Sequence, residues 1–137
     1  MKQNVDYGFD IQKVYLEMML GDAETFVRCQ AIFEPSIFAR RLQPAADFLK
    51  TYVEEHNILP TQDMVNVVSS DVKFTVATNL KEEHYDWLLQ DFETFARHKN
   101  LEAAILKGAD LVEKCEYGAV EDLVKKAVQI GLQKDLG

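Results

Sequence analysis

The chain has 137 residues, a length that forms one ordinary domain with a core of its own. Its formal net charge of −8 argues against a protein whose main task is to grip phosphate backbones, because that task takes clustered Lys and Arg. A hydrophobic content of 47% argues against disorder, and six glycines and three prolines are few enough for mostly regular structure.

Two helices are predicted in the first third of the chain. Apolar residues at helical spacing in 11–20 are Ile11, Val14, Tyr15, Met18 and Met19. Gly21 ends this helix and Asp22 can cap the next one. Phe26, Val27 and Ile32 then cover a short second helix, before Pro35 and Ser36 break the pattern.

Two further helices are predicted around a turn at residues 58–60. The first has Pro44 in its opening turn and ends near Asn57. Thr61 is a good N-cap for the second, and Asp63 is favourable near its dipole. The residues expected to face inward are Phe48, Leu49, Tyr52 and Val53, then Met64, Val65, Val67 and Val68.

Residues 69–81 give the weakest signal. Val72, Phe74 and Val76 alternate as in a short strand. Because a single strand in a helical protein would have no partner, we expect a loop or a short helix here.

The last third of the chain predicts a helical hairpin. A long helix runs from Glu82 to about Glu116, Tyr117-Gly118 forms a tight turn, and a last helix follows. Such a hairpin is too long for a compact domain of this size to cover, so its apolar stripe predicts an oligomer. The long helix's apolar face is Leu88, Phe92, Phe95, Leu101, Ile105, Val112 and Cys115, and the interface candidates are Leu101, Ile105, Val112, Val120, Leu123, Val124, Ala127 and Ile130.

No catalytic or metal-binding pattern is found in the sequence. There is no G-x-x-x-x-G-K-[ST] loop for ATP, and His56, His84 and His98 show no metal-ligand spacing, so we expect ordinary surface or capping histidines. Cys29 and Cys115 are interpreted as small core residues of a reduced protein. Trp87 is interpreted as a core or interface anchor.

The location expected is the cytoplasm. Polar residues such as Asn4, Asp6 and Asp10 interrupt any signal-peptide core, and no apolar run approaches the ~20 residues of a membrane span.

Two basic clusters stand out against the negative net charge. They are Arg40-Arg41 and Arg97 with His98 and Lys99. Solvated surface is the more ordinary interpretation. A contact for an acidic partner or a nearby DNA strand is the alternative, with Arg40, Arg41, Arg97 and Lys99 as the candidates.

The order of these segments resembles the N-terminal domain of DnaB-type replicative DNA helicases, in the version carried by tailed phages. Residues 11–20 (IQKVYLEMML) look like its opening helix, and residues 33–38 (FEPSIF) look like its short turn that ends in an aromatic residue. Residues 48–65 (FLKTYVEEHNILPTQDMV) look like its helix, turn and following capped helix. Residues 87–105 (WLLQDFETFARHKNLEAAI) look like the first arm of its hairpin, and residues 119–136 look like the second arm.

The resemblance implies an all-α fold and a non-catalytic role. Residues 1–137 would be one helical collar domain, with a globular part at 1–81, a hairpin at 82–133 and the start of a linker at 134–137. ATP and Mg would belong to a motor domain after Gly137, and this fragment would hold no cofactor. The implied partners are a second copy (a dimer, or a trimer of dimers in a hexameric ring), primase and helicase loader, with DNA contacted only indirectly and no membrane. A phage protein of this kind would act in the cytoplasm of the host cell.

Three alternatives remain at this point. The helicase-binding domain of a primase has a similar helical fold but sits at a primase C-terminus. A stand-alone phage adaptor built on a helical hairpin would stop at Gly137, whereas a helicase gene would continue into a P-loop ATPase domain. A small helical enzyme is the least favoured, because the catalytic constellations are missing.

Overall fold

A computed structural model of the chain describes residues 7–129. Within that range the structure is all-helical and contains no strand, which confirms the all-α prediction. The elements in chain order are α1 (Phe9–Leu20), α2 (Ala23–Cys29), the 3-10 turns η1 (Gln30–Ile32), η2 (Pro35–Ile37) and η3 (Arg40–Leu42), α3 (Gln43–His56), α4 (Gln62–Val68), α5 (Glu82–Glu113) and α6 (Tyr117–Val128).

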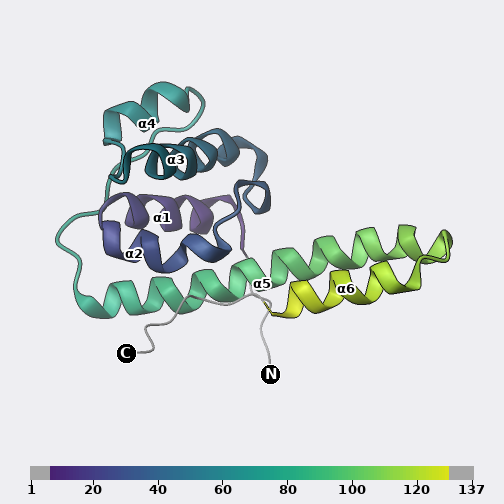
Figure 1. Ribbon diagram of the computed structural model, residues 1–137. Helices are drawn as coiled ribbons and strands as arrows, with labels where there is room; N and C mark the ends of the chain where they lie inside the picture. Colours follow the sequence, from purple (N-terminus) through teal and green to yellow (C-terminus); the bar gives the residue numbers. More distant parts are fainter. Residues whose placement is uncertain (1–6, 130–137) are drawn as a thin grey trace.

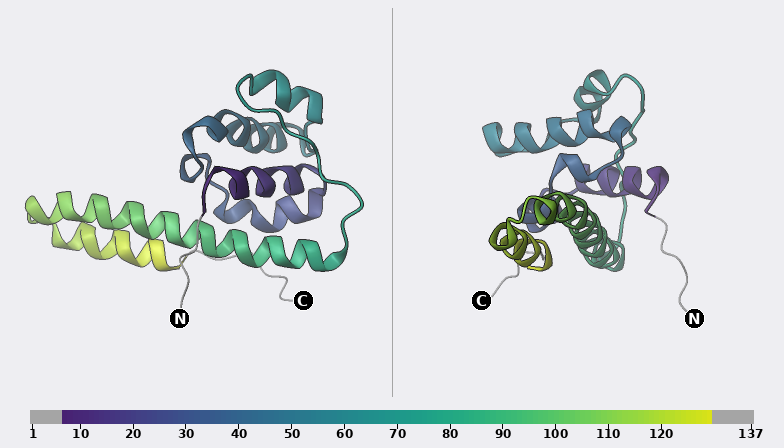
Figure 2. Two further views of the ribbon diagram at one scale, coloured as in Figure 1. Left: turned by 180° about the vertical axis from the view of Figure 1, so that it is seen from behind. Right: turned by 90° about the vertical axis from the view of Figure 1, so that its right-hand side faces the viewer.

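The molecule consists of a small helical core and a projecting arm. Helices α1 to α4 stack on the first half of α5, and α6 runs antiparallel to its second half (Figure 1). Seen from behind, the second half of α5 and α6 extend beyond the stacked helices (Figure 2, left). We call the second half of α5 together with α6 the arm.

Aromatic rings hold α5 in the core. Phe92 lies edge-on to Tyr15 of α1 with ring centroids 5.6 Å apart, and stacks with Phe33 at 6.1 Å. Phe95 contacts Phe38, with centroids 5.6 Å apart. All five side chains are buried. The first half of α5 is therefore a core helix, and only the part after about residue 100 is free to form the arm.

The helix boundaries follow local signals. The side chain of Asp22 accepts a hydrogen bond from the Thr25 N–H at 3.1 Å, and Thr61 Oγ1 accepts one from the Met64 N–H at 3.2 Å, as N-caps should. At the other end of α3, Asn57 takes the left-handed conformation (φ 61°) that commonly ends helices. The predicted caps at Asp22 and Thr61 are confirmed.

Several predicted inward positions are wrong. Val14 and Val27 are exposed, although each was assigned to a buried stripe. In α4 only Val65 is buried, while Val67 is 80% exposed and Val68 is also exposed. Helix α4 has seven residues and, among the helices, packs mainly against α3, so one side of it faces the core while Val67 and Val68 face solvent.

Residues 69–81 form an extended loop, as one of the two expectations had it. Side chains take the place of a neighbouring strand. Asn66 Oδ1 accepts from the Phe74 N–H at 2.7 Å and its Nδ2 donates to the Phe74 carbonyl at 3.0 Å. Gln62 and Glu17 accept from the N–H groups of Val76 and Thr75, each at 2.8 Å. The alternating apolar residues of this segment do face the core, since Val72 and Phe74 are buried. Their backbone groups are hydrogen-bonded by side chains, so the segment needs no neighbouring strand.

Candidate functional site

Small side chains form the contact between the two helices of the arm. Ala104 and Gly108 of α5 and Ala127 of α6 are the buried residues of this region. A methyl group placed on Gly108 would lie 3.9 Å from Val120 Cγ1, an ordinary van der Waals distance. The arm is thus a closely apposed helix pair with little side-chain volume between its members.

The turn at the tip of the arm lies before the predicted one. The Glu116 N–H donates to the Leu111 carbonyl and the Cys115 N–H to the Val112 carbonyl, each at 2.9 Å. This is a Schellman-type C-cap, with Cys115 (φ 61°) at the position that glycine usually occupies. Tyr117 and Gly118, predicted as the turn, are the first residues of α6 instead. Cys115 is exposed, so its assignment to the core was wrong.

The structure divides the predicted interface residues into two sets. Val120, Leu123 and Ala127 lie on the side of α6 that meets α5. The other candidates within the described residues, which are Leu101, Ile105, Val112 and Val124, are exposed. Ile130 lies outside the described residues.

The exposed set lies on one side of the arm. Ile105, Val124 and Val128 each come one position after a residue of the contact between the two helices, namely Ala104, Leu123 and Ala127. Leu101, Val112 and Tyr117 lie four or seven residues from them on the same helix and therefore on the same side. One residue turns the helix by about 100°. Because α5 and α6 are antiparallel, a step in the same sense from their shared contact line leads to the same side of the pair.

Six exposed residues make up this surface, which we call the apolar arm face. Tyr117 and Val128 belong to it, although they were not among the predicted interface residues. Their spacing from Val124, seven residues before and four after, is the signal that could have identified them. The apolar arm face comprises Leu101, Ile105, Val112, Tyr117, Val124 and Val128, with Ala109 and Glu121 at the remaining positions of this side.

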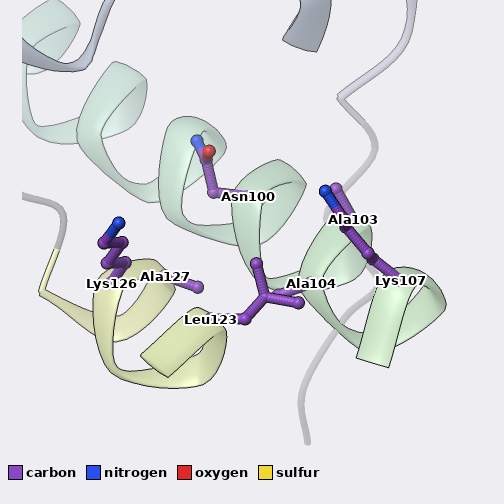
Figure 3. Close-up of a pocket in the computed structure, with 7 residues that line it drawn as sticks. All are labelled: Asn100, Ala103, Ala104, Lys107, Leu123, Lys126 and Ala127. Atoms are coloured by element: carbon purple, nitrogen blue, oxygen red, sulfur yellow. The ribbon is translucent and has the colours of Figure 1, made fainter. Parts of the chain in front are cut away.

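The opposite side of the arm is polar. The residues one position before the inner contact include Lys107 and Asp110 of α5 and Asp122 and Lys126 of α6. On this side a shallow hollow of about 200 Å³ lies between the helices, with Leu123 directed into it and the two lysines at its rim (Figure 3). The arm therefore has one apolar and one charged long side, which is the asymmetry expected of a helix pair that binds through one face.

Three of the four predicted cationic contacts have local partners. Arg97 lies 3.1 Å from Glu93, and Lys99 lies 3.6 Å from Glu102. Arg41 stacks over the Phe9 ring at 4.9 Å. Arg40 begins the 3-10 turn before α3 and is exposed. Exposed pairs of this kind are typical of solvated surface.

His84 and Trp87 of α5 both have local contacts. His84 Nδ1 accepts a hydrogen bond from the Lys81 N–H at 2.9 Å and so caps α5, while Trp87 is partly exposed beside the Tyr15 ring. Within residues 7–129, no three His, Cys, Asp or Glu side chains gather as metal ligands. None of the helices in that range has the length and apolarity needed to cross a bilayer.

No family model matches this chain, and no curated protein or solved structure matches it either. Among the described residues, the apolar arm face is the surface feature that indicates a function.

Proposed function

We propose that this chain is the N-terminal oligomerisation domain of a DnaB-type replicative DNA helicase, and that it pairs with a second copy through the apolar arm face. The domain is not catalytic by itself. The observation that carries the proposal is the one-sided clustering of six exposed apolar residues on a projecting helix pair.

A second copy of the chain is the occupant that fits this face best. Contiguous exposed apolar patches on soluble domains mark interaction sites. The face is an elongated row of aliphatic side chains and one tyrosine, so two such rows can cover each other across a two-fold axis. Self-pairing through this face relies on its apolar side chains and not on ion pairs between the copies.

The helicase assignment draws on the resemblance in segment order. A small helical part followed by a helical hairpin is the arrangement which that resemblance implies. Primase and helicase loader are then the proposed further partners, and nucleotide and Mg would be bound by a motor domain encoded after Gly137. Reading the codons beyond Gly137 tests this part: a P-loop ATPase is expected, and a stop codon there would favour a stand-alone adaptor.

Two neighbouring residues of α5 provide a matched test of the pairing. Ile105 is 62% exposed on the apolar arm face, whereas Leu106 is 72% exposed and one step further around the helix, beside a groove near Phe9 and Ile37. Ile105→Asp should abolish self-association, because an unpaired carboxylate would be buried in the interface. Leu106→Asp should leave it unchanged.

Sedimentation of wild type and both variants over a concentration series gives the readout, and circular dichroism checks that each variant is folded. A folded Ile105→Asp variant with the wild-type mass would contradict the proposal. So would a wild-type chain that stays monomeric up to the millimolar range.

A further inference from the structure

The inner contact of the arm buries little apolar surface. Of the twelve residues of α6 only Ala127 is buried, while Val120 and Leu123 are partly buried. The buried residues that α5 contributes beyond residue 100 are Ala104 and Gly108. Hydrophobic stabilisation scales with the apolar area removed from water, and Ala and Gly have the least to remove. The hollow of about 200 Å³ beside Leu123 reduces the contact further.

Other interactions add little to hold α6 in place. The ion pairs of the arm within residues 7–129 run along α5, as Lys99–Glu102 and Lys114–Asp110 do, and not from α5 to α6. A helix of twelve residues is also at the lower limit of what is stable in isolation. Helix α6 therefore depends on its docking contact, which is long but lined by small or only partly buried side chains.

The core half of α5 differs sharply from the arm half. Leu88, Phe92 and Phe95 are fully buried among large side chains, so this half is fixed by the globular part. One continuous helix thus has a firmly held half and a half whose partner helix is weakly held. Local opening is expected where buried apolar contacts are fewest.

We propose that α6 docks stably on α5 only when a second copy covers the apolar arm face, so that arm folding and pairing are one coupled equilibrium. This rests on the self-association proposed above. A second copy adds apolar burial to both helices at once, since the face contains three residues of α5 and three of α6. Binding to the docked state alone then stabilises that state by mass action.

Amide hydrogen exchange compares α6 in the monomer and in the dimer. Both proteins are measured at one concentration, at which the wild type is a dimer and Ile105→Asp is a monomer. The substitution leaves the contact between α5 and α6 unchanged, because Ile105 lies on the apolar arm face and not in that contact. Exchange of α6 amides should be at least tenfold faster in the variant, while α1 amides exchange equally in both. Equal α6 protection in monomer and dimer would overturn the coupling.

Gly108→Ala tests the coupling from inside the arm. The added methyl meets only Val120, at 3.9 Å, and leaves the apolar arm face untouched. On the Ile105→Asp background it should slow α6 exchange roughly three- to fivefold, which is the contribution of one methyl group that is removed from water only when α6 docks, expressed as an equilibrium ratio. In the otherwise wild-type chain it should tighten dimerisation roughly tenfold, because two arms each gain this contact.

These measurements distinguish a failure of the self-association from a failure of the coupling. A wild type that sediments as a monomer at every concentration removes the self-association, and the coupling with it. A dimer whose affinity is unchanged by Gly108→Ala, and whose α6 amides are protected equally in the monomer, removes the coupling and leaves the self-association standing.

Discussion

Cys29 and Tyr15 are ionisable residues that the core keeps neutral. Cys29 is fully buried, and burial raises the pKa of its thiol to about 12. Burial is also the main cause that raises the pKa of Tyr15, and its hydroxyl donates a hydrogen bond to Asp91 of α5. Both groups bind their proton more tightly in the folded chain than in the unfolded one.

The stability of the fold should therefore decrease in alkaline solution. Below pH 9.0, the ordinary pKa of the thiol, folded and unfolded chains both keep the Cys29 proton. Between there and about 12 only the unfolded chain releases it, so the free energy of unfolding falls by up to about 1.4 kcal/mol per pH unit.

Urea denaturation from about pH 8 to about pH 11 measures this slope. Cys29→Ala should be less stable at neutral pH because of the cavity it leaves, but its stability should fall less steeply above about pH 9. An identical slope for both proteins would rule out Cys29 as the cause.

The burial of a single residue can be predicted from the sequence only where the residues that pack around it can also be predicted. The sequence assigned both cysteines to the core, and this is right for Cys29 and wrong for Cys115. Small apolar residues are usually buried. The exception at Cys115 arises because the residue makes the left-handed turn at the tip of the arm, where nothing packs over it.

At the scale of elements, the end of α1 is tightly fitted to the 69–81 loop. A methyl group on Gly21 would lie 2.4 Å from the Ala77 carbonyl oxygen and 3.3 Å from Val76 Cγ1. The Ala77 N–H in turn donates to the Glu17 carbonyl at 3.2 Å. Only glycine leaves room for the loop to pass this close to the helix end.

Gly21→Ala should therefore destabilise the protein. The backbone oxygen of Ala77 must move, and forcing an extra methyl into a closely packed site costs roughly 1–3 kcal/mol. Urea denaturation is the measurement. Gly118→Ala is the control, since nothing lies within 4 Å of the added methyl, and it should be neutral or slightly stabilising. Equal stability of Gly21→Ala and wild type would contradict the close approach.

Helix starts were better predicted than helix faces. The caps at Asp22 and Thr61 depend on side chains within three residues of each other, so the local sequence contains the whole signal. The face that a short helix buries depends on which neighbour it meets, and α4 shows this through Val67. The 69–81 loop was hardest to predict because its backbone partners, Asn66, Gln62 and Glu17, are side chains of other elements.

At the scale of the whole molecule, pairing through an apolar surface has a characteristic salt dependence. Two copies of net charge −8 repel each other, and salt screens that repulsion. The apolar contact itself involves no charge pairs. Raising NaCl from low to physiological concentration should therefore leave the dimer dissociation constant unchanged or lower it. A constant that rises steeply with salt, measured by sedimentation, would indicate an ionic interface instead.

The sequence predicted an arm with apolar residues but not which side they occupy. Leu101, Ile105, Val112 and Val124 face outward, whereas Val120, Leu123 and Ala127 face α5. Both sets have helical spacing, so periodicity cannot separate them. The distinction comes from α5 changing neighbours along its length: among the described residues, its first half packs against the globular part and its second half against α6.

Helix α5 belongs to both parts of the molecule, and this sets the geometry of any assembly. Its 32 residues span about 48 Å without a break. A rod anchored among the core aromatics at one end has no joint at which the arm could swing. In the proposed pair joined by the arms, the length and direction of α5 would therefore fix how far each core lies from the contact between the copies.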